Sequence, residues 1–344
     1  MNGFSNLLST SRAIVGGPFV VVAVLLVLGG TADSGYDYGA TSTLCINLVA
    51  LIGLNLIAGH AGQLVLGYAA LMAVGAYTVA VAGTDHGLSG PVTLLLAPAL
   101  GALLAVVIGV PTLRLRGLYF GVGTLAFAVI VDFFNNRAVP ITGGPDGKLV
   151  GPLTIGIRNY SNPEDFFYFT LAITAAVLVF ERLFVRTWTA WGLKAARTSE
   201  PAAASAGVPI FSARLGTFAL SGAIAGLAGA LLAYQTLYVS PSSFTLHESI
   251  DLFVVLFVGG MATFVGPIVG AAILYVFTRW LAPYPELKPL LLGMVFLVAL
   301  RFLPGGVGAA LNKLRALVRA RRRPPGTPNR AAKESASVPA GVSS

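Results

Sequence analysis

The sequence predicts an all-α polytopic membrane protein with about ten transmembrane helices, some of them short or broken. Of its 344 residues, 56% are hydrophobic and only 10% are charged, whereas about 25% of residues are charged in soluble domains. A soluble fold of this length needs a polar exterior that this composition cannot supply. The mean hydropathy of +0.82 agrees. Apolar runs separated by short polar segments then place the individual helices.

Runs of about 20 apolar residues, the length that crosses a bilayer, follow one another along the chain. The first, residues 13–30, is expected to be a retained anchor, and a cleavable signal peptide is the alternative because a short basic start precedes it. Residues 252–281 would form a helix of about 45 Å, which exceeds the bilayer. Glycines and Pro267 interrupt this stretch, so two short helices or one broken helix are expected. The other predicted spans are residues 43–58, 62–83, 91–111, 118–134, 167–184, 215–235 and 289–303.

Basic residues set the predicted orientation, because they favour the cytoplasmic side of a membrane. Arg114 and Arg116 occupy the turn 113–117, and further Lys and Arg residues mark the segment 185–214, so both are expected in the cytoplasm. An even number of crossings returns the arginines of residues 319–323 to the same side. The expected count is therefore ten, or eight if two segments are re-entrant.

The predicted organisation is one transmembrane domain with short ends. Residues 1–12 form a cytoplasmic N-terminus, residues 13–303 form the transmembrane domain, and residues 304–344 form a basic cytoplasmic tail. The tail is rich in Pro, Ala, Ser and Arg. It is expected to be disordered, because it lacks the apolar residues that would offset the entropy lost on ordering.

The side chains argue against a metal site, a nucleic-acid partner and an enzyme. Cys45 is the single cysteine and the three histidines are scattered, so no metal-ligand spacing is present. The net charge of +9 gathers in the loops and the tail, as the membrane orientation requires. Residues 143–148 fall one residue short of the phosphate-binding loop spacing, and Leu149 follows them where Ser or Thr is needed. We therefore expect a glycine-rich turn there, with no cofactor bound by this chain.

Residues 53–77 carry the densest set of polar groups within an apolar run. Asn55, Gln63, Tyr68 and Tyr77 are separated by four glycines. One interpretation is tight helix packing by small residues, with the polar groups bridging helices. The other is a broken helix that lines a substrate path, because irregular backbone is tolerated at membrane depth where it lines a cavity.

The predicted cytoplasmic segment 185–214 contains a second signal. Ser199, Glu200 and Pro201 are typical of the first turn of a short helix, and Gly207 is typical of its end. A short helix on this face would offer a docking surface to a partner protein. A solvated connecting loop is the alternative.

These two segments, together with residues 113–127 and 142–147, resemble the LivM-like permease subunits of branched-chain amino-acid ABC importers. Residues 249–271 resemble the same family, and the resemblance extends over about residues 40–305 in the same order. It implies that the segment 200–207 seats on an ATPase subunit. The coupling residues it implies are Lys194, Arg197, Glu200, Ala203 and Gly207.

The resemblance also implies a function. The chain would be a multi-pass subunit in a bacterial plasma (cell inner) membrane that moves branched-chain or other hydrophobic amino acids. An extracytoplasmic solute-binding protein would deliver them, a second related permease would complete the pore, and two ATP-binding subunits would hydrolyse ATP. Urea or short amides are the alternative cargo. An ion-coupled secondary transporter is a further alternative, but Glu181 lies at the end of a span and is expected to reach the interface.

Overall fold

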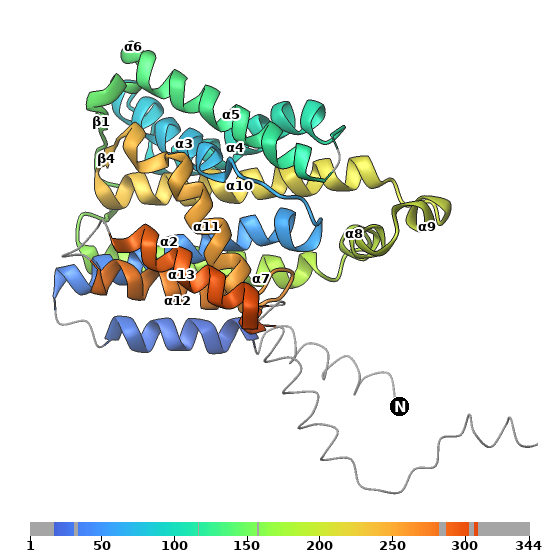
Figure 1. The fold of residues 1–344 in the computed structure, drawn as a ribbon. Coiled ribbons are helices and arrows are strands. Elements are labelled where there is room, and N and C mark those ends of the chain that lie inside the picture. The colour runs from blue at the N-terminus through green and yellow to red at the C-terminus, as the bar shows by residue number, and fades with distance from the viewer. Residues whose placement is uncertain are drawn as a thin grey trace, which may run out of the picture.

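The computed structural model describes residues 17–30, 34–115, 117–156, 158–281, 287–302 and 306–308. Figure 1 shows long helices lying side by side in one bundle. Among the described residues, six helical segments are long and apolar enough to cross a membrane, and two shorter apolar helices accompany them. The predicted terminus 1–12 and nearly all of the tail 304–344 lie outside the described residues.

Each of the ten predicted spans overlaps a described helix, and several of these helices are short. The longest is α10 with 27 residues, whereas α11 has 14 and α12 has 16. The multi-span helical architecture is confirmed, while the count of ten crossings stays a prediction. In chain order the helices are Gly17–Gly30, α2 (Gly35–Leu54), η1 (Asn55–His60), α3 (Tyr68–Thr78), η2 (Val79–Asp85), α4 (Gly90–Thr112), α5 (Leu118–Arg137), α6 (Val139–Thr142), η3 (Gly144–Asp146), α7 (Pro163–Phe184), α8 (Trp188–Thr198), α9 (Glu200–Ser205), α10 (Ile210–Thr236), η4 (Pro241–Phe244), α11 (Leu246–Gly259), α12 (Val265–Trp280) and α13 (Leu287–Phe302).

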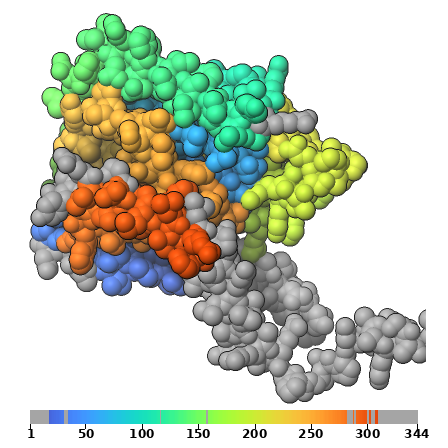
Figure 2. Space-filling model, in the orientation of Figure 1, coloured from blue at the N-terminus to red at the C-terminus, as the bar shows by residue number. Residues whose placement is uncertain are grey.

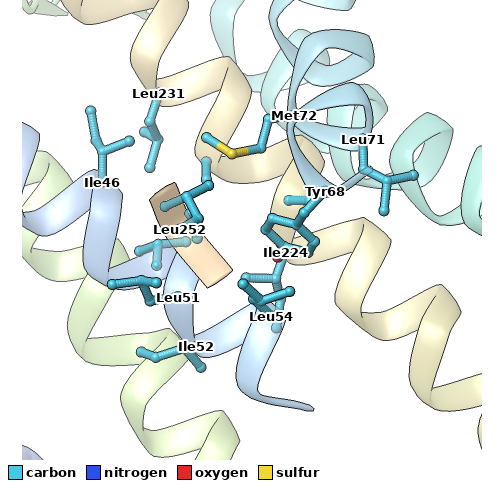
Figure 3. Close-up of a cluster of buried hydrophobic side chains, with 14 of the residues drawn as sticks. Ile46, Leu51, Ile52, Leu54, Tyr68, Leu71, Met72, Ile224, Leu231 and Leu252 are labelled. Atoms are coloured by element: carbon cyan, nitrogen blue, oxygen red, sulfur yellow. The ribbon is translucent and has the colours of Figure 1, made fainter. Parts of the chain in front are cut away.

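The core of the bundle forms where α2, α3, α10 and α11 meet. Figure 3 shows Ile46 and Leu51 of α2, Met72 of α3, Leu231 of α10 and Leu252 of α11 pointing toward one another. All five side chains are almost completely buried. These apolar contacts fix the positions of the helices that carry the polar residues described below.

Close backbone contact joins α10 to α3 and α4. A Cβ atom added to Gly226 would lie 2.4 Å from the carbonyl oxygen of Ala97, and one added to Gly75 would lie 1.9 Å from the carbonyl oxygen of Gly226. Small residues permit this approach, which is how helices gain packing energy in a membrane. The first interpretation of the polar, glycine-rich region, tight packing, is therefore correct for Gly75.

Replacing Gly226 by alanine should lower the thermal midpoint of the detergent-solubilised protein. Overpacking of this kind costs about 1–3 kcal/mol, because the helices must move apart to admit the methyl group. Gly216 is the matched control, since it lies on the same helix with no atom within 4 Å of an added Cβ. Equal midpoints for Gly226→Ala and Gly216→Ala would contradict the close contact.

The helix predicted over 62–83 is wrong in its first part. Helix η1 ends at His60, residues 61–67 are not helical, and α3 begins only at Tyr68. Gly62 has a φ of +69°, a conformation that glycine adopts readily. We call residues 61–67 the break. Side chains distant in sequence accept hydrogen bonds from amides in and next to it: Leu66 donates to Thr124 Oγ1 at 3.1 Å, and Ala69 donates to Ser249 Oγ at 2.9 Å.

The stretch 252–281 is divided into two helices, as predicted. Helix α11 ends at Gly259 and α12 begins at Val265. Gly260 has a φ of +110° and Ala262 a φ of +58°, so the backbone turns sharply between the helices. We call residues 260–264 the α11–α12 turn.

The two ends of the bundle carry different structures. At one end, β1 (Lys148–Leu149) pairs antiparallel with β4 (Tyr238–Val239), and β2 (Thr154–Ile155) pairs with β3 (Arg158–Asn159). These short strands were not expected. Figure 1 places β1, β4 and α6 at the end opposite α8 and α9. We call these the β1–β4 end and the α8–α9 end.

Candidate functional site

The Asn55 side chain joins three separate parts of the chain near the break. Its Nδ2 donates to Glu181 Oε1 at 2.8 Å and to the carbonyl oxygen of Thr263 at 3.2 Å. Its Oδ1 accepts a hydrogen bond from the amide of Ala262 at 2.9 Å. Asn55 has no exposed surface. It therefore ties η1 to α7 and to the α11–α12 turn.

The expectation that Glu181 reaches the membrane interface is wrong. Its exposed fraction is 1%, and its Oε2 has no hydrogen-bond partner among the described residues. The reason is local packing, since η1 and the α11–α12 turn cover this end of α7. The neighbouring guanidinium of Arg182 lies 3.7 Å from the ring centroid of Phe264, which is part of the same turn.

Arg197 of α8 contacts the broken helix directly. Its guanidinium donates a hydrogen bond to the carbonyl oxygen of Gly59 in η1. Carbonyls in the last turn of a helix lack partners within the helix. A Cβ atom on Gly62 would lie 3.0 Å from Arg197 Cγ, so the aliphatic part of Arg197 also packs on the break. This contact links α8 to the start of the irregular segment 61–67.

Helices α8 and α9 fill most of the segment that was expected to be a loop. The short helix predicted after Ser199 is confirmed as α9, and the Ser199 side chain accepts a hydrogen bond from the amide of Ala202. Gly207 has a φ of +80° just beyond its end. Helix α8 was not expected, and α10 already begins at Ile210. The predicted segment 185–214 therefore overlaps the first turn of α10.

The remaining predicted coupling residues differ in their surroundings. Glu200 forms an ion pair with Arg214, which lies on α10. Ala203 is buried against the rest of the protein, with an exposed fraction of 3%. Lys194 is exposed, with its Nζ 5.7 Å from the ring centroid of Trp191. Helix α9 is thus fastened to α10 by the ion pair between Glu200 and Arg214.

A cavity of about 640 Å³ lies at the α8–α9 end, next to the break. Gln63 lines it, together with Arg197 and Glu200. In Figure 2 the blue surface of the segment near residue 60 is visible between the teal atoms of α5, the yellow-green atoms of α8 and α9, and orange atoms of the α11–α12 region. The structure therefore brings one predicted path residue together with two predicted coupling residues.

The other predicted path residues lie elsewhere. Tyr68 is fully buried, and its hydroxyl donates to the carbonyl oxygen of Ser221 at 3.3 Å. The Tyr77 hydroxyl is buried and has no hydrogen-bond partner among the described residues. Tyr77 lines a second cavity of about 640 Å³, between α3, α4 and α5. Gln63 and Tyr77 thus line two different cavities, whereas Asn55 and Tyr68 hold buried contacts.

The glycine-rich segment near residue 145 forms a turn. Gly143, Gly144 and Gly147 all have positive φ angles, and η3 occupies three residues between the outer two. Lys148 forms an ion pair with Asp85 and donates to the carbonyl oxygen of Ile141 at 3.1 Å. Within the described ranges, no group of three or more His, Cys, Asp or Glu side chains is placed to hold a metal ion.

Comparisons with known proteins assign a family. Residues 35–300 match the family described as "Branched-chain amino acid transport system / permease component". The chain is 33% identical over 298 residues to the high-affinity branched-chain amino acid transport system permease protein LivM of Salmonella typhimurium strain LT2, covering 78% of this chain and 68% of that protein. It is 32% identical over 312 residues to LivM of Escherichia coli strain K12, covering 82% and 71%. No solved structure gives a significant match.

Proposed function

Because the chain belongs to the branched-chain amino acid transport permease family, we propose that it is the membrane-spanning subunit of an ATP-driven importer. Its cargo is a branched-chain or other hydrophobic amino acid. A solute-binding protein delivers the cargo at the β1–β4 end. A second, related permease completes the pore, and two ATP-binding subunits dock at the α8–α9 end. No residue of this chain makes or breaks a bond, since its work is a shift between conformations.

The contact between Arg197 and Gly59 is the observation that carries this proposal. It gives α8 a direct connection to the membrane-embedded break. Helix α9 follows α8 after Ser199 and is paired to α10 through Glu200 and Arg214. A displacement of α9 by an ATP-binding subunit would therefore reach both the segment 61–67 and α10. Discrete rearrangements of packed elements of this kind accompany domain closure in many proteins.

In this proposal, the cargo passes through the two cavities that Tyr77 and Gln63 line. Tyr77 lies toward the β1–β4 end and Gln63 lies at the α8–α9 end. Asn55 and Tyr68 support the walls, because their polar groups are engaged in buried hydrogen bonds. An irregular segment between two half-helices at such a site is typical of transporters.

The orientation follows from the same proposal. The α8–α9 end faces the cytoplasm of a bacterial cell, and the β1–β4 end faces outward. Gly17 packs near Arg182 at the end of α7, and Gly306 packs on Gly260 in the α11–α12 turn. Both described ends of the chain thus lie on the cytoplasmic side, in agreement with an even number of crossings.

Buried Glu181 favours a second candidate, an ion-coupled carrier. Ionisable groups buried in a membrane are costly and often serve proton or ion transport. Glu181 is nevertheless bound to Asn55 and lies close to the positive charge of Arg182. Those contacts suit a structural role as well as a transport role. Uptake driven by an ion gradient without ATP would favour this candidate.

The cargo is tested with right-side-out membrane vesicles that contain the complete importer. Labelled leucine or labelled urea is supplied outside together with the binding protein, and ATP is enclosed at the cytoplasmic face. We expect ATP-dependent uptake of leucine and none of urea. Urea uptake with the same ATP dependence would overturn the amino-acid cargo. Uptake of neither compound would overturn both the amino-acid cargo and the urea alternative.

A further inference from the structure

We propose that the cavity at the α8–α9 end binds the transported molecule before its release, and that it selects an amino acid through its carboxylate and its aliphatic side chain. This rests on the importer function proposed above. The cavity of about 640 Å³ lies within the range of about 300–1,000 Å³ that small-molecule sites occupy. Its position next to the break and α8 places it where a coupling movement would open or close it.

One wall of the cavity is apolar and comes from the last helices of the bundle. Phe253 and Phe257 of α11 contribute, with Met261 of the α11–α12 turn and Phe296 of α13. The rings of Phe257 and Phe296 meet edge to face, with centroids 5.4 Å apart. All four side chains are only partly buried. This wall gives an aliphatic side chain an apolar surface on which to lose its contact with water.

A second wall is polar and carries one excess positive charge. Its charged members are Arg197, Arg214 and Glu200, and Glu200 is already paired with Arg214. Arg214 Nε is buried without a hydrogen-bond partner among the described residues. The guanidinium groups of arginine match the geometry of a carboxylate and bind it through charge-assisted hydrogen bonds. This wall therefore favours an anionic group on the bound molecule.

Gln63 completes the polar wall. It lines the cavity, and its exposed fraction is 9%. An amide side chain both donates and accepts hydrogen bonds, so Gln63 can pair with a polar group of the bound molecule. An amino acid offers a carboxylate and an ammonium group to this wall and its side chain to the aromatic wall. Urea offers neither a charge nor an apolar side chain.

Protection of a cysteine placed in the cavity tests the site. Cys45 is the single native cysteine and is completely buried. In the complete purified importer, a charged methanethiosulfonate should modify Met261→Cys and leave the native chain unmodified. Leucine at about ten times its Kd should slow this modification about tenfold, because only the unoccupied fraction reacts. Leucinamide lacks the carboxylate and should protect far less, and urea should give no protection.

Ser161→Cys is the matched control, since Ser161 is exposed between β3 and α7, outside the cavity lining and away from the α8–α9 end. Leucine should leave its modification rate unchanged. If Met261→Cys does not assemble, Phe253→Cys reports on the same wall. Unchanged modification at the cavity cysteine, in an importer that still takes up leucine, would overturn the site and leave the proposed function intact. Equal protection by leucinamide would overturn the carboxylate selection, and the absence of leucine uptake by the native importer would overturn the proposed function itself.

Discussion

Replacing Asn55 by leucine is expected to lower the free energy of unfolding by about 3 kcal/mol. The substitution leaves the Glu181 carboxylate, the amide of Ala262 and the carbonyl of Thr263 without their shared partner. A buried polar group left unsatisfied costs about 1–3 kcal/mol, and more when it is charged. The thermal midpoint of the solubilised protein measures the loss.

Asn136→Leu is the control for Asn55→Leu. Asn136 also bonds through its amide, to Asp132 on the same helix, but this contact is exposed to solvent. Surface substitutions of this kind change stability by about 0.5 kcal/mol or less. Equal midpoints for Asn55→Leu and Asn136→Leu would contradict the buried network.

The double variant Asn55→Leu with Glu181→Leu shows how much of the stability loss comes from the unpaired Glu181 carboxylate and how much from the other partners of Asn55. Replacing both members of a buried hydrogen bond by apolar groups is far less costly than removing one member. We expect the double variant to be more stable than Asn55→Leu alone. A further loss of stability would show that Glu181 has contacts of its own that do not depend on Asn55.

Replacing Arg197 by methionine is expected to reduce ATP-dependent leucine uptake about tenfold while ATP hydrolysis continues. The substitution keeps an unbranched apolar side chain but removes the hydrogen bond to the carbonyl of Gly59. A hydrogen bond from a charged group contributes about 1.5–3 kcal/mol, and about 1.4 kcal/mol corresponds to a tenfold change in an equilibrium. The ratio of leucine transported to ATP hydrolysed measures the effect.

Arg186→Met is the control for Arg197→Met. Arg186 lies in the same segment between α7 and α8, and its side chain is exposed. Its loss should leave the transport ratio unchanged. A parallel fall in uptake and ATP hydrolysis in Arg197→Met would mean that Arg197 supports docking of the ATP-binding subunit and does not transmit its movement.

The placement of the helices could be predicted because backbone groups within a membrane must find their partners inside the helix, so each span needs a long apolar run. The division between α11 and α12 was equally visible, since Gly259, Gly260 and Gly266 interrupt the run. The span predicted over 62–83 begins too early, whereas the alternative of a broken helix within residues 53–77 includes the irregular backbone of residues 61–67. Its bounds were not predictable, because the hydroxyls that bind the amide of Leu66 within it and the amide of Ala69 just after it come from Thr124 and Ser249, far away in sequence.

The candidate site was predictable only where the signal was local. Ser199 and Gly207 marked α9 correctly, because a helix start and a helix end depend on a few adjacent residues. Asn55 stood out as a polar residue in an apolar run, but its partner Glu181 lies 126 residues away. Because Glu181 lies close to the end of a span, its carboxylate is expected from the sequence to reach the membrane interface, but it is buried. The packing that buries it depends on the α11–α12 turn, whose position no local pattern reveals.

The central claim, that this chain is one part of an ATP-driven importer, is tested most directly by omission of subunits. The chain is reconstituted in liposomes with the second permease, the ATP-binding subunits and the binding protein, and each is left out in turn. Labelled leucine is supplied outside, with ATP enclosed at the cytoplasmic face. We predict uptake only when every subunit and ATP are present. Uptake by this chain alone, driven by a proton gradient without ATP, would contradict the account.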